Sequence, residues 1–423
     1  MWKTCWAAAP QGPYPVGNVA VQTDLSLVFP DPARGAVNQS FRLTLRPDLW
    51  GERFRIRFSN RWGLKPVVIG HAYLGLLHSS SAVLAGTNTP LSFSGDMRVV
   101  IQPGDAVWSD GVALSICTSL NRMLLLGRKL AVSFHVEGES GPITWHATAM
   151  NTSYVSWPDA GPVGAEEEEF SFPFSVNSWF FVDAVDVEAS SDTLVVVCLG
   201  DSITDGSNST LNGEDRWPDA LSRRAHALCG DTISVVNAGI GGNQVRGPES
   251  YSAVDPYRGG PSALQRAAYD VLSLSGVGMV VWLEGINDFH LPETTVDEVA
   301  AAMEAVATRL RAESPGIRIA ACTLPPALGS ILPDYGGKEQ DEKRLALNEF
   351  IRTTGAFDAF IDFAAAATDP VTGRLRAEFV PNSTRGGEGD GLHPNRLGKL
   401  KMVQVMDVAK ILAGGSGDCT LRA

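Results

Sequence analysis

Over about the first 190 residues, apolar and polar side chains alternate in many short stretches. The alternation is regular at 41–45 and 54–58, which predicts strands that bury one face and expose the other. Further runs of this kind, separated by Gly, Pro, Asn and Asp, occupy residues 67–77, 107–116, 130–136 and 179–187. Many short strands separated by turn residues predict an all-β domain, either an antiparallel sandwich or a jelly roll.

From residue 194 onward the pattern changes, and apolar runs of strand length alternate with helical segments. The apolar runs lie at 194–199, 232–237, 279–283, 317–323 and 357–361. Such alternation predicts right-handed crossovers on a parallel sheet. Five strands of this kind fit an α/β three-layer sandwich of the flavodoxin-like type, which binds ligands outside the carboxyl ends of its strands.

One helix can be placed from its spacing alone. Between the third and fourth of these runs, apolar residues recur at alternating steps of three and four, and they are Val296, Val299, Met303, Val306 and Leu310. Steps of this size put all of them on one stripe of a helix. We therefore expect an amphipathic helix in this interval.

A chain of 423 residues is longer than a single hydrophobic core usually allows, so we expect two domains. The change of pattern predicts a β-sandwich or jelly-roll-like accessory domain at 1–192 and an α/β domain at 193–423. The first domain includes a linker, 156–192, with an acidic run at 166–169 and a cluster of six aromatic residues between 170 and 181. We expect the acidic run to be a solvated loop. The aromatic residues are expected to dock one domain on the other, and a lid over the active site is the alternative.

Charge and composition argue against some functions. The net charge of -13 disfavours binding to nucleic acids and to anionic membrane surfaces, because both repel an acidic protein. The N-terminal segment lacks the apolar run of a signal peptide, and no apolar stretch is long enough to span a bilayer. These features predict a cytoplasmic protein, or a secreted one if a leader has been removed. The six cysteines form no Cys-x-x-Cys pair, so we expect reduced, buried thiols.

The first apolar run of the second half ends in a turn that carries Ser202, directly after Gly200 and Asp201. A serine at the carboxyl edge of a parallel sheet is accessible to solvent, and the N-terminus of a following helix favours developing negative charge. The alternative is that Ser202 only caps the next helix. This segment alone does not decide between the two.

Three further segments bring polar groups to the same edge of the sheet. A glycine-rich turn at 239–243 follows the second strand and allows a backbone N–H to approach a ligand. Asn287 follows the third strand and offers a neutral amide donor, and Asp390 stands three residues before His393 near the end of the chain. A serine, neutral hydrogen-bond donors and an Asp/His pair are the groups that an acyl-transfer site needs.

These four segments resemble the four signature blocks of the SGNH (GDSL-type) hydrolase superfamily, in their usual order. The resemblance covers residues 194 to about 412 and implies a serine esterase of three-layer α/β fold. It implies that Ser202 is the nucleophile and that Asp390 and His393 complete a catalytic triad. It also implies an oxyanion hole formed by the backbone N–H of Ser202 with Gly242 and Asn287.

The surroundings of these blocks give two further expectations. Pro394 favours an extended conformation at His393 and suits the first turn of a helix, which we expect to run to about residue 412. From their adjacency to the blocks, we expect the substrate pocket to be lined by Ile203, Trp217, Ile240 and Phe289. The chemistry requires no metal or cofactor, and the remaining histidines are too dispersed to suggest a metal site.

The first half is similar, less specifically, to a region of larger two-domain bacterial GDSL-type esterases, on residues 53–60, 103–110 and 142–154. This similarity implies a jelly-roll-like accessory domain. Its role is open between covering the hydrolase core, shaping the acyl pocket, binding carbohydrate and associating copies into a homo-oligomer. We favour structural support.

The sequence as a whole predicts a carboxylesterase whose partner is a small-molecule ester, with a short acyl group. An acetylated carbohydrate is the alternative substrate, which makes the protein a carbohydrate O-acetyl esterase. Two other classes stay open. One is a carbohydrate-binding protein with a vestigial hydrolase domain, and the other is an acyltransferase that uses the same acyl-enzyme.

Overall fold

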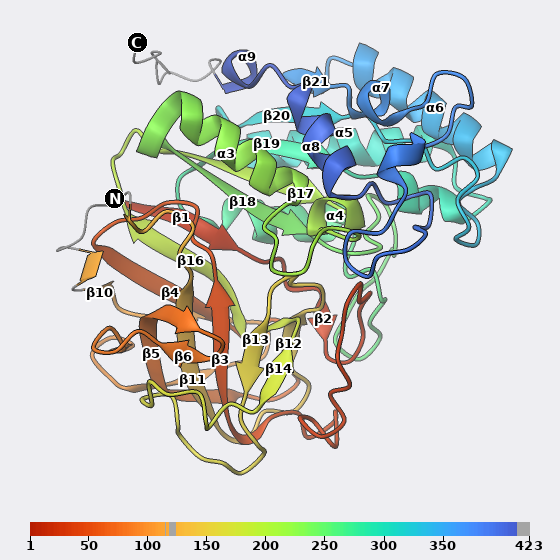
Figure 1. Ribbon diagram of the computed structural model, residues 1–423. Helices are drawn as coiled ribbons and strands as arrows, with labels where there is room; N and C mark the ends of the chain where they lie inside the picture. The colour runs from red at the N-terminus through yellow and green to blue at the C-terminus, as the bar shows by residue number, and fades with distance from the viewer. Residues whose placement is uncertain (115, 118–123, 413–423) are drawn as a thin grey trace. The chain divides into compact units, whose positions relative to one another are not determined.

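The computed structural model describes residues 1–114, 116–117 and 124–412. The chain divides into two compact units, which Figure 1 draws in the colours of the chain. The first unit contains Met1–Ser191 together with Ser252–Arg258, and the second contains the rest.

The short segment Ser252–Arg258 joins the first unit from far along the chain. Gln11 helps to fasten it there, because its Nε2 donates to the carbonyl oxygen of Arg258 at 2.7 Å. The segment contains neither strand nor helix. No hydrophobic periodicity therefore marks it in the sequence.

The first unit is built from antiparallel sheets. One sheet has the order β1–β16–β4–β10, with β9 also paired to β4; its strands are β1 (Trp2–Ala7), β4 (Arg53–Ser59), β9 (Ala106–Trp108), β10 (Val112–Ala113) and β16 (Val182–Glu188). The largest sheet has the order β14–β13–β3–β11–β5–β6, with β7 and β8 paired to β5; its strands are β3 (Val37–Leu45), β5 (Val67–Ser79), β6 (Ala82–Val83), β7 (Thr89–Pro90), β8 (Arg98–Ile101), β11 (Leu130–Glu139), β13 (Ser153–Val155) and β14 (Phe174–Val176). A small sheet, β15–β12–β2, consists of β2 (Gly12–Pro13), β12 (Thr144–His146) and β15 (Trp179–Phe180).

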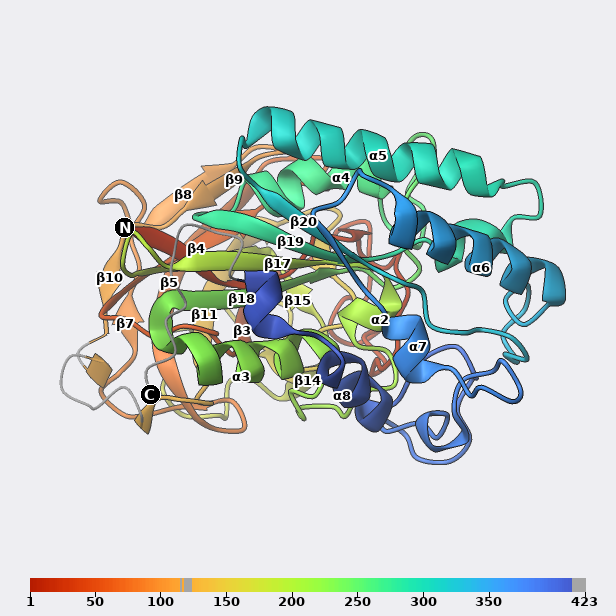
Figure 2. The same cartoon turned by 90° about the horizontal axis from the view of Figure 1, so that it is seen from above.

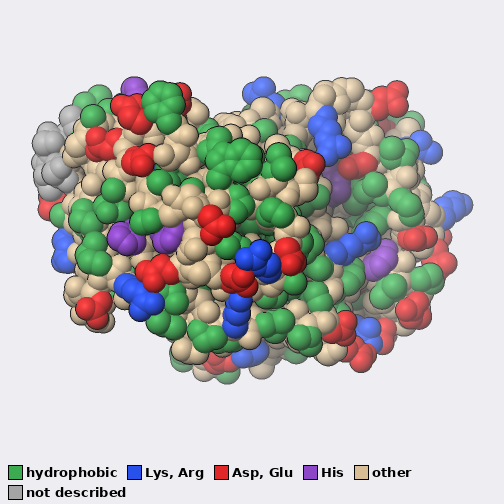
Figure 3. Space-filling view, turned by 90° about the horizontal axis from the view of Figure 1, so that it is seen from below, with side chains coloured by type: hydrophobic (Ala, Val, Ile, Leu, Met, Phe, Trp, Pro, Cys, Tyr) green, Lys and Arg blue, Asp and Glu red, His purple; other side chains and the backbone are tan. Residues whose placement is uncertain are grey.

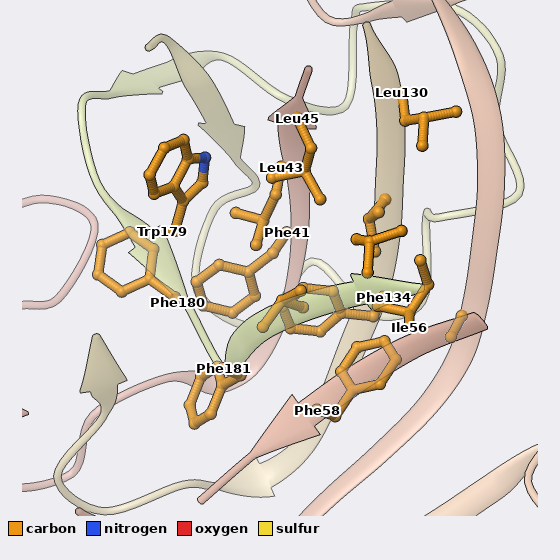
Figure 4. Close-up of a cluster of buried hydrophobic side chains, with 14 of the residues drawn as sticks. Phe41, Leu43, Leu45, Ile56, Phe58, Leu130, Phe134, Trp179, Phe180 and Phe181 are labelled. Carbon is orange, nitrogen blue, oxygen red and sulfur yellow. The ribbon is translucent and has the colours of Figure 1, made fainter. Parts of the chain in front are cut away.

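Side chains from the two larger sheets meet in one apolar core (Figure 4). Phe41 on β3 and Phe134 on β11 stack with ring centroids 5.1 Å apart. Phe58 on β4 meets the Phe134 ring edge-on at 5.3 Å. The two sheets therefore pack face to face as a sandwich, and the narrower jelly-roll description stays a prediction.

The segment 156–192 is not a linker, because much of it belongs to the first unit. It supplies β14, β15 and β16 to three different sheets. Trp179, Phe180 and Phe181 are buried in the core of this unit, whereas Phe170 is 85% exposed. The aromatic cluster thus mainly closes the sandwich. The strand expected at 107–116 is also reduced, to the short strands β9 and β10.

The second unit contains a five-stranded parallel sheet with the order β18–β17–β19–β20–β21. Its strands are β17 (Leu194–Gly200), β18 (Ile233–Gly239), β19 (Val277–Leu283), β20 (Arg318–Cys322) and β21 (Ala359–Ile361). All five strands lie where the sequence predicts them. Numbered along the chain, the five strands lie in the order 2-1-3-4-5. This is the order of the flavodoxin-like fold.

Helices cover both faces of this sheet (Figure 2). α3 (Trp217–Cys229) packs against α8 (Arg396–Gln404) and α9 (Val408–Leu412), while α4 (Ala263–Ala267), α5 (Val296–Glu313) and α6 (Lys338–Thr353) pack in series. The helix expected from its apolar stripe is α5. Its residues Val299, Met303, Val306 and Leu310 are buried, and Thr295 caps its N-terminus. The helix expected to continue to residue 412 is instead broken into α8 and α9.

The thiols follow the expectation in part. Cys5, Cys117, Cys198 and Cys322 are reduced and buried. The expectation is wrong for Cys229, which ends α3 and is disulfide-bonded, and Cys419 lies outside the described residues.

Surface composition gives one further observation. Acidic, basic and apolar side chains are interspersed on the face seen from below (Figure 3). Within residues 1–114, 116–117 and 124–412, no helix has both the length and the apolar composition needed to cross a membrane.

Candidate active site

Ser202 lies immediately beyond the carboxyl end of β17, an interior strand of the parallel sheet, at the start of the short helix α2 (Ser202–Asp205). Asp201 caps this helix, since its Oδ1 accepts a hydrogen bond from the backbone N–H of Ile203 at 2.9 Å. The cap is thus Asp201, and the alternative that Ser202 caps the helix is wrong. The Ser202 hydroxyl is available for a different partner.

That partner is His393, from a loop 191 residues further along the chain. The distance between Ser202 Oγ and His393 Nε2 is 2.7 Å. On the other side of the ring, His393 Nδ1 lies 2.6 Å from Asp390 Oδ2. The structure therefore brings together the three residues that the sequence predicts as a triad, in the order hydroxyl, imidazole, carboxylate.

Asp390 is held as a carboxylate by hydrogen bonds. Its Oδ1 accepts the backbone N–H groups of Leu392 and His393 at 2.9 and 2.8 Å. Burial acts to raise its pKa, but the hydrogen bonds and the charge interaction with His393 outweigh burial and hold the pKa well below its usual range. The side chains of His393 and Asp390 are 12% and 20% exposed, so the site retains access to solvent.

The loop that carries His393 is fastened to the segment after Ser202. Asn208 Nδ2 donates to the carbonyl oxygen of His393 at 3.2 Å. Lys399, one turn into α8, is fully buried and donates to Ser209 Oγ at 2.8 Å and to the carbonyl oxygen of Ser207. Burial lowers the pKa of Lys399 to about 7. The serine and the histidine are therefore positioned by a common set of contacts.

Sheet register brings the predicted hydrogen-bond donors to the same edge. Gly200 at the end of β17 pairs with Gly239 on β18 and with Leu283 on β19. The segments that carry Ser202, Gly242 and Asn287 therefore leave three adjacent strands at one level. Gly242 has a φ of +78°, a left-handed conformation that glycine adopts without strain.

Free N–H groups are present in these segments. Among the described residues, no group accepts a hydrogen bond from the backbone N–H of Ser202 or of Gly242. The side chain of Asn287 is buried, and its Nδ2 donates one N–H to the carbonyl oxygen of Asn243 at 2.8 Å. Within the described part of the chain, no acceptor lies at the second N–H of this amide. That N–H can therefore donate a hydrogen bond to a ligand.

A buried arginine, which the sequence analysis does not identify, stabilises this edge. Arg266 donates to the carbonyl oxygens of Gly200 and Ala238, the ends of β17 and β18, at 2.9 and 2.8 Å. Its Nε also donates to Asn243 Oδ1 at 2.6 Å. Asp288 next to Asn287 accepts two backbone N–H groups, and burial raises its pKa to about 7.

The four residues expected to line the substrate pocket are all buried, and their role in substrate binding stays a prediction. Ile203, Trp217, Ile240 and Phe289 are between 0% and 2% exposed. Trp217, for example, packs its ring edge-on against Phe363 and donates its indole N–H to Thr204 Oγ1.

Comparison with known proteins identifies the fold of the second unit. Residues 198–400 match the model of the GDSL-like lipase/acylhydrolase family. The match extends from β17 through Ser202 to α8 beyond His393. The protein is therefore a carboxylic ester hydrolase. More particularly, its second unit carries a GDSL-like lipase/acylhydrolase domain with the SGNH hydrolase fold.

Solved structures match about half of the chain. A carbohydrate acetylesterase family member from Sinorhizobium meliloti is 20% identical with a TM-score of 0.40, and the match covers 52% of this chain and 99% of that one. The native aryl esterase of M. smegmatis is 14% identical with a TM-score of 0.39, covering 52% and 98%. A lipase/acylhydrolase from Enterococcus faecalis is 22% identical with a TM-score of 0.37, covering 50% and 93%. None of the curated proteins compared with the chain matches it.

Proposed function

We propose that the protein is a serine carboxylesterase that hydrolyses small esters with short acyl groups through an acyl-enzyme. The observation that carries this proposal is the continuous chain of hydrogen bonds from Ser202 Oγ through both nitrogens of His393 to Asp390. Serine is a weak nucleophile on its own and needs an adjacent base, and the base needs a group that fixes its tautomer. The chain of hydrogen bonds supplies both.

The first half-reaction forms the acyl-enzyme. Ser202 Oγ attacks the ester carbonyl carbon, and its proton moves to His393 Nε2. The bond from the tetrahedral carbon to the alcohol oxygen then breaks, and the same proton passes to the departing alkoxide. Asp390 stabilises the imidazolium that exists between these transfers.

The second half-reaction releases the acid. A water molecule attacks the acyl carbon and gives its proton to His393 Nε2, and the proton returns to Ser202 Oγ as the carbon–serine bond breaks. In both half-reactions the carbonyl oxygen becomes an oxyanion. Its donors are the backbone N–H groups of Ser202 and Gly242 and the side-chain N–H of Asn287, which are already oriented before charge develops.

The experiment compares wild type with Ser202→Ala on p-nitrophenyl acetate, butyrate and octanoate. We expect rates that fall with acyl length for wild type, and a loss of at least about 10⁴-fold for Ser202→Ala, because the nucleophile is removed. Ser314→Ala, at the end of α5, is the matched control and should keep the wild-type rate. Equal rates for wild type and Ser202→Ala would falsify the proposal.

The same assay separates the other candidate functions. Release of acetate from peracetylated sugars at higher kcat/KM than from p-nitrophenyl acetate makes the protein a carbohydrate O-acetyl esterase. Acyl transfer to an added alcohol that exceeds hydrolysis makes it an acyltransferase. Sugar binding with no product from any activated ester identifies a vestigial hydrolase domain.

A further inference from the structure

We infer that Tyr335 is a positioning residue, which holds the side-chain amide of Asn287 as a donor to the oxyanion. The Tyr335 hydroxyl donates to Asn287 Oδ1 at 2.7 Å. Tyr335 belongs to the long loop between β20 and α6, outside the four segments that carry the other site residues. The inference rests on the proposed function, since it assigns a role to the environment of a proposed oxyanion donor.

The two ends of the Asn287 amide have different chemical requirements. Nδ2 faces the carbonyl oxygen of Asn243. A carbonyl oxygen can accept a hydrogen bond but cannot donate one, so the nitrogen end of the amide must lie on this side. Oδ1 is buried with the rest of the side chain and therefore needs a donor, because a buried acceptor without a partner is destabilising. The Tyr335 hydroxyl is that donor. Together the two contacts orient the amide with one N–H left for substrate.

Tyr335 is itself positioned by contacts that do not involve its hydroxyl. Its ring stacks on the His290 ring, with centroids 6.2 Å apart and planes inclined by 12°. His290 Nδ1 in turn lies 2.5 Å from the carbonyl oxygen of Asn287. Removing the hydroxyl therefore leaves the aromatic ring in place, and a phenylalanine at this position tests the hydrogen bond alone.

The loop that carries Tyr335 is also fastened to the acid of the triad. Ser330 Oγ and the backbone N–H of Ile331 both donate to the carbonyl oxygen of Asp390, at 2.8 and 3.0 Å. The loop is closed on itself, because the Gly329 N–H donates to the carbonyl oxygen of Gly336 at 2.9 Å. One closed loop thus contacts both the side chain of the proposed donor and the main chain of the proposed acid.

The hydrogen bond from Tyr335 has an electronic effect as well as a steric one. Donation to Oδ1 polarises the amide and makes the remaining N–H a stronger donor. This gain is largest when the ligand oxygen carries negative charge, which is the case in the transition state and not in the bound ester. Loss of the hydroxyl should therefore lower kcat more than it raises KM.

The test is Tyr335→Phe, assayed on p-nitrophenyl acetate. We expect kcat to fall by about 10-fold, with KM changed by less than about 2-fold, as for one neutral hydrogen bond lost in the transition state. Tyr269→Phe removes a hydroxyl from another half-buried tyrosine of the second unit and should leave kcat unchanged. A wild-type kcat for Tyr335→Phe overturns the inference.

A double-mutant cycle separates positioning from general stability. In an Asn287→Ala background, Tyr335→Phe should cost less than about 2-fold in kcat, because its target is already absent. An undiminished loss in that background overturns the inference, since the hydroxyl then acts elsewhere. Full activity of Ser202→Ala or of Asn287→Ala is a different result, which contradicts the proposed function itself.

Discussion

The site has two halves that are built in different ways. The proton-handling half, Ser202, His393 and Asp390, joins segments far apart in the chain through two short hydrogen bonds, and one of its members carries a full charge. The donor half, Gly242 and Asn287, consists of neutral groups at the ends of neighbouring strands. In the proposed mechanism, the first half moves protons during the reaction, whereas the second only has to be oriented in advance. Substitutions in the two halves should therefore differ in how much activity they remove and in how they remove it.

A large loss of activity is expected for Asp390→Asn, in the proton-handling half. An amide can neither fix the required tautomer of His393 nor stabilise the imidazolium, so we expect kcat to fall by about 10⁴-fold. Steady-state kinetics on p-nitrophenyl acetate measures this loss. Asp369→Asn, a half-buried aspartate that caps a turn, is the control. If kcat of Asp390→Asn falls by less than about 10-fold, the negative charge of Asp390 is not needed for the reaction. The distinction between the two halves is then lost.

A smaller effect is expected for Asn287→Ala, in the donor half. One of three donors is lost, so kcat should fall by about 10²–10³-fold while KM changes little. The thermal midpoint must be measured as well, because the variant also leaves Tyr335 and the carbonyl oxygen of Asn243 without their partner. A change confined to KM contradicts a role in the transition state.

The smallest effect on activity, and a distinct effect on stability, is expected for Lys399→Met. Burial lowers the pKa of this lysine to about 7, whereas an exposed lysine has a pKa of about 10.4. Between these values the unfolded chain binds a proton that the folded chain does not, so this group makes unfolding more costly as pH rises from 7 to 10. The methionine variant lacks this contribution.

Urea unfolding at pH 7, 8 and 9 measures the difference. The free energy of unfolding of wild type relative to Lys399→Met should increase with pH, by a few kcal/mol in total. Lys401→Met, an exposed lysine on the same helix, should follow the wild-type pH dependence. If the free energy of unfolding has the same pH dependence in wild type and Lys399→Met, the Lys399 amine does not titrate between pH 7 and 9, and the prediction is contradicted.

The two halves also differ in what the sequence reveals. The Asp390–His393 pair is recognisable because both residues lie within one short loop, and Ser202 because a buried apolar strand ends directly before it. Tyr335, Arg266 and Lys399 also contact the segments of the site. They come from parts of the sequence without a distinctive pattern. Such residues act through contacts that form only when distant parts of the chain have packed.

The two units show the same limit on a larger scale. Strands of the parallel sheet are continuous apolar runs, so all five are predicted near their observed positions. In the first unit, 156–192 looks like a linker because it is rich in Gly, Pro and Glu, yet it supplies three strands. Short edge strands are stabilised by partners far along the chain, as β2 is by β12, and their own sequence carries a weak signal.

The central claim is that Ser202 is the nucleophile, and covalent trapping tests it most directly. Wild type and Ser202→Ala are incubated with a fluorophosphonate, which phosphonylates an activated serine, and the label is located by mass spectrometry of peptides. We predict one label per chain in wild type, on the peptide with Ser202, and none in Ser202→Ala. A label on a different residue, or an equal label in both proteins, contradicts the account.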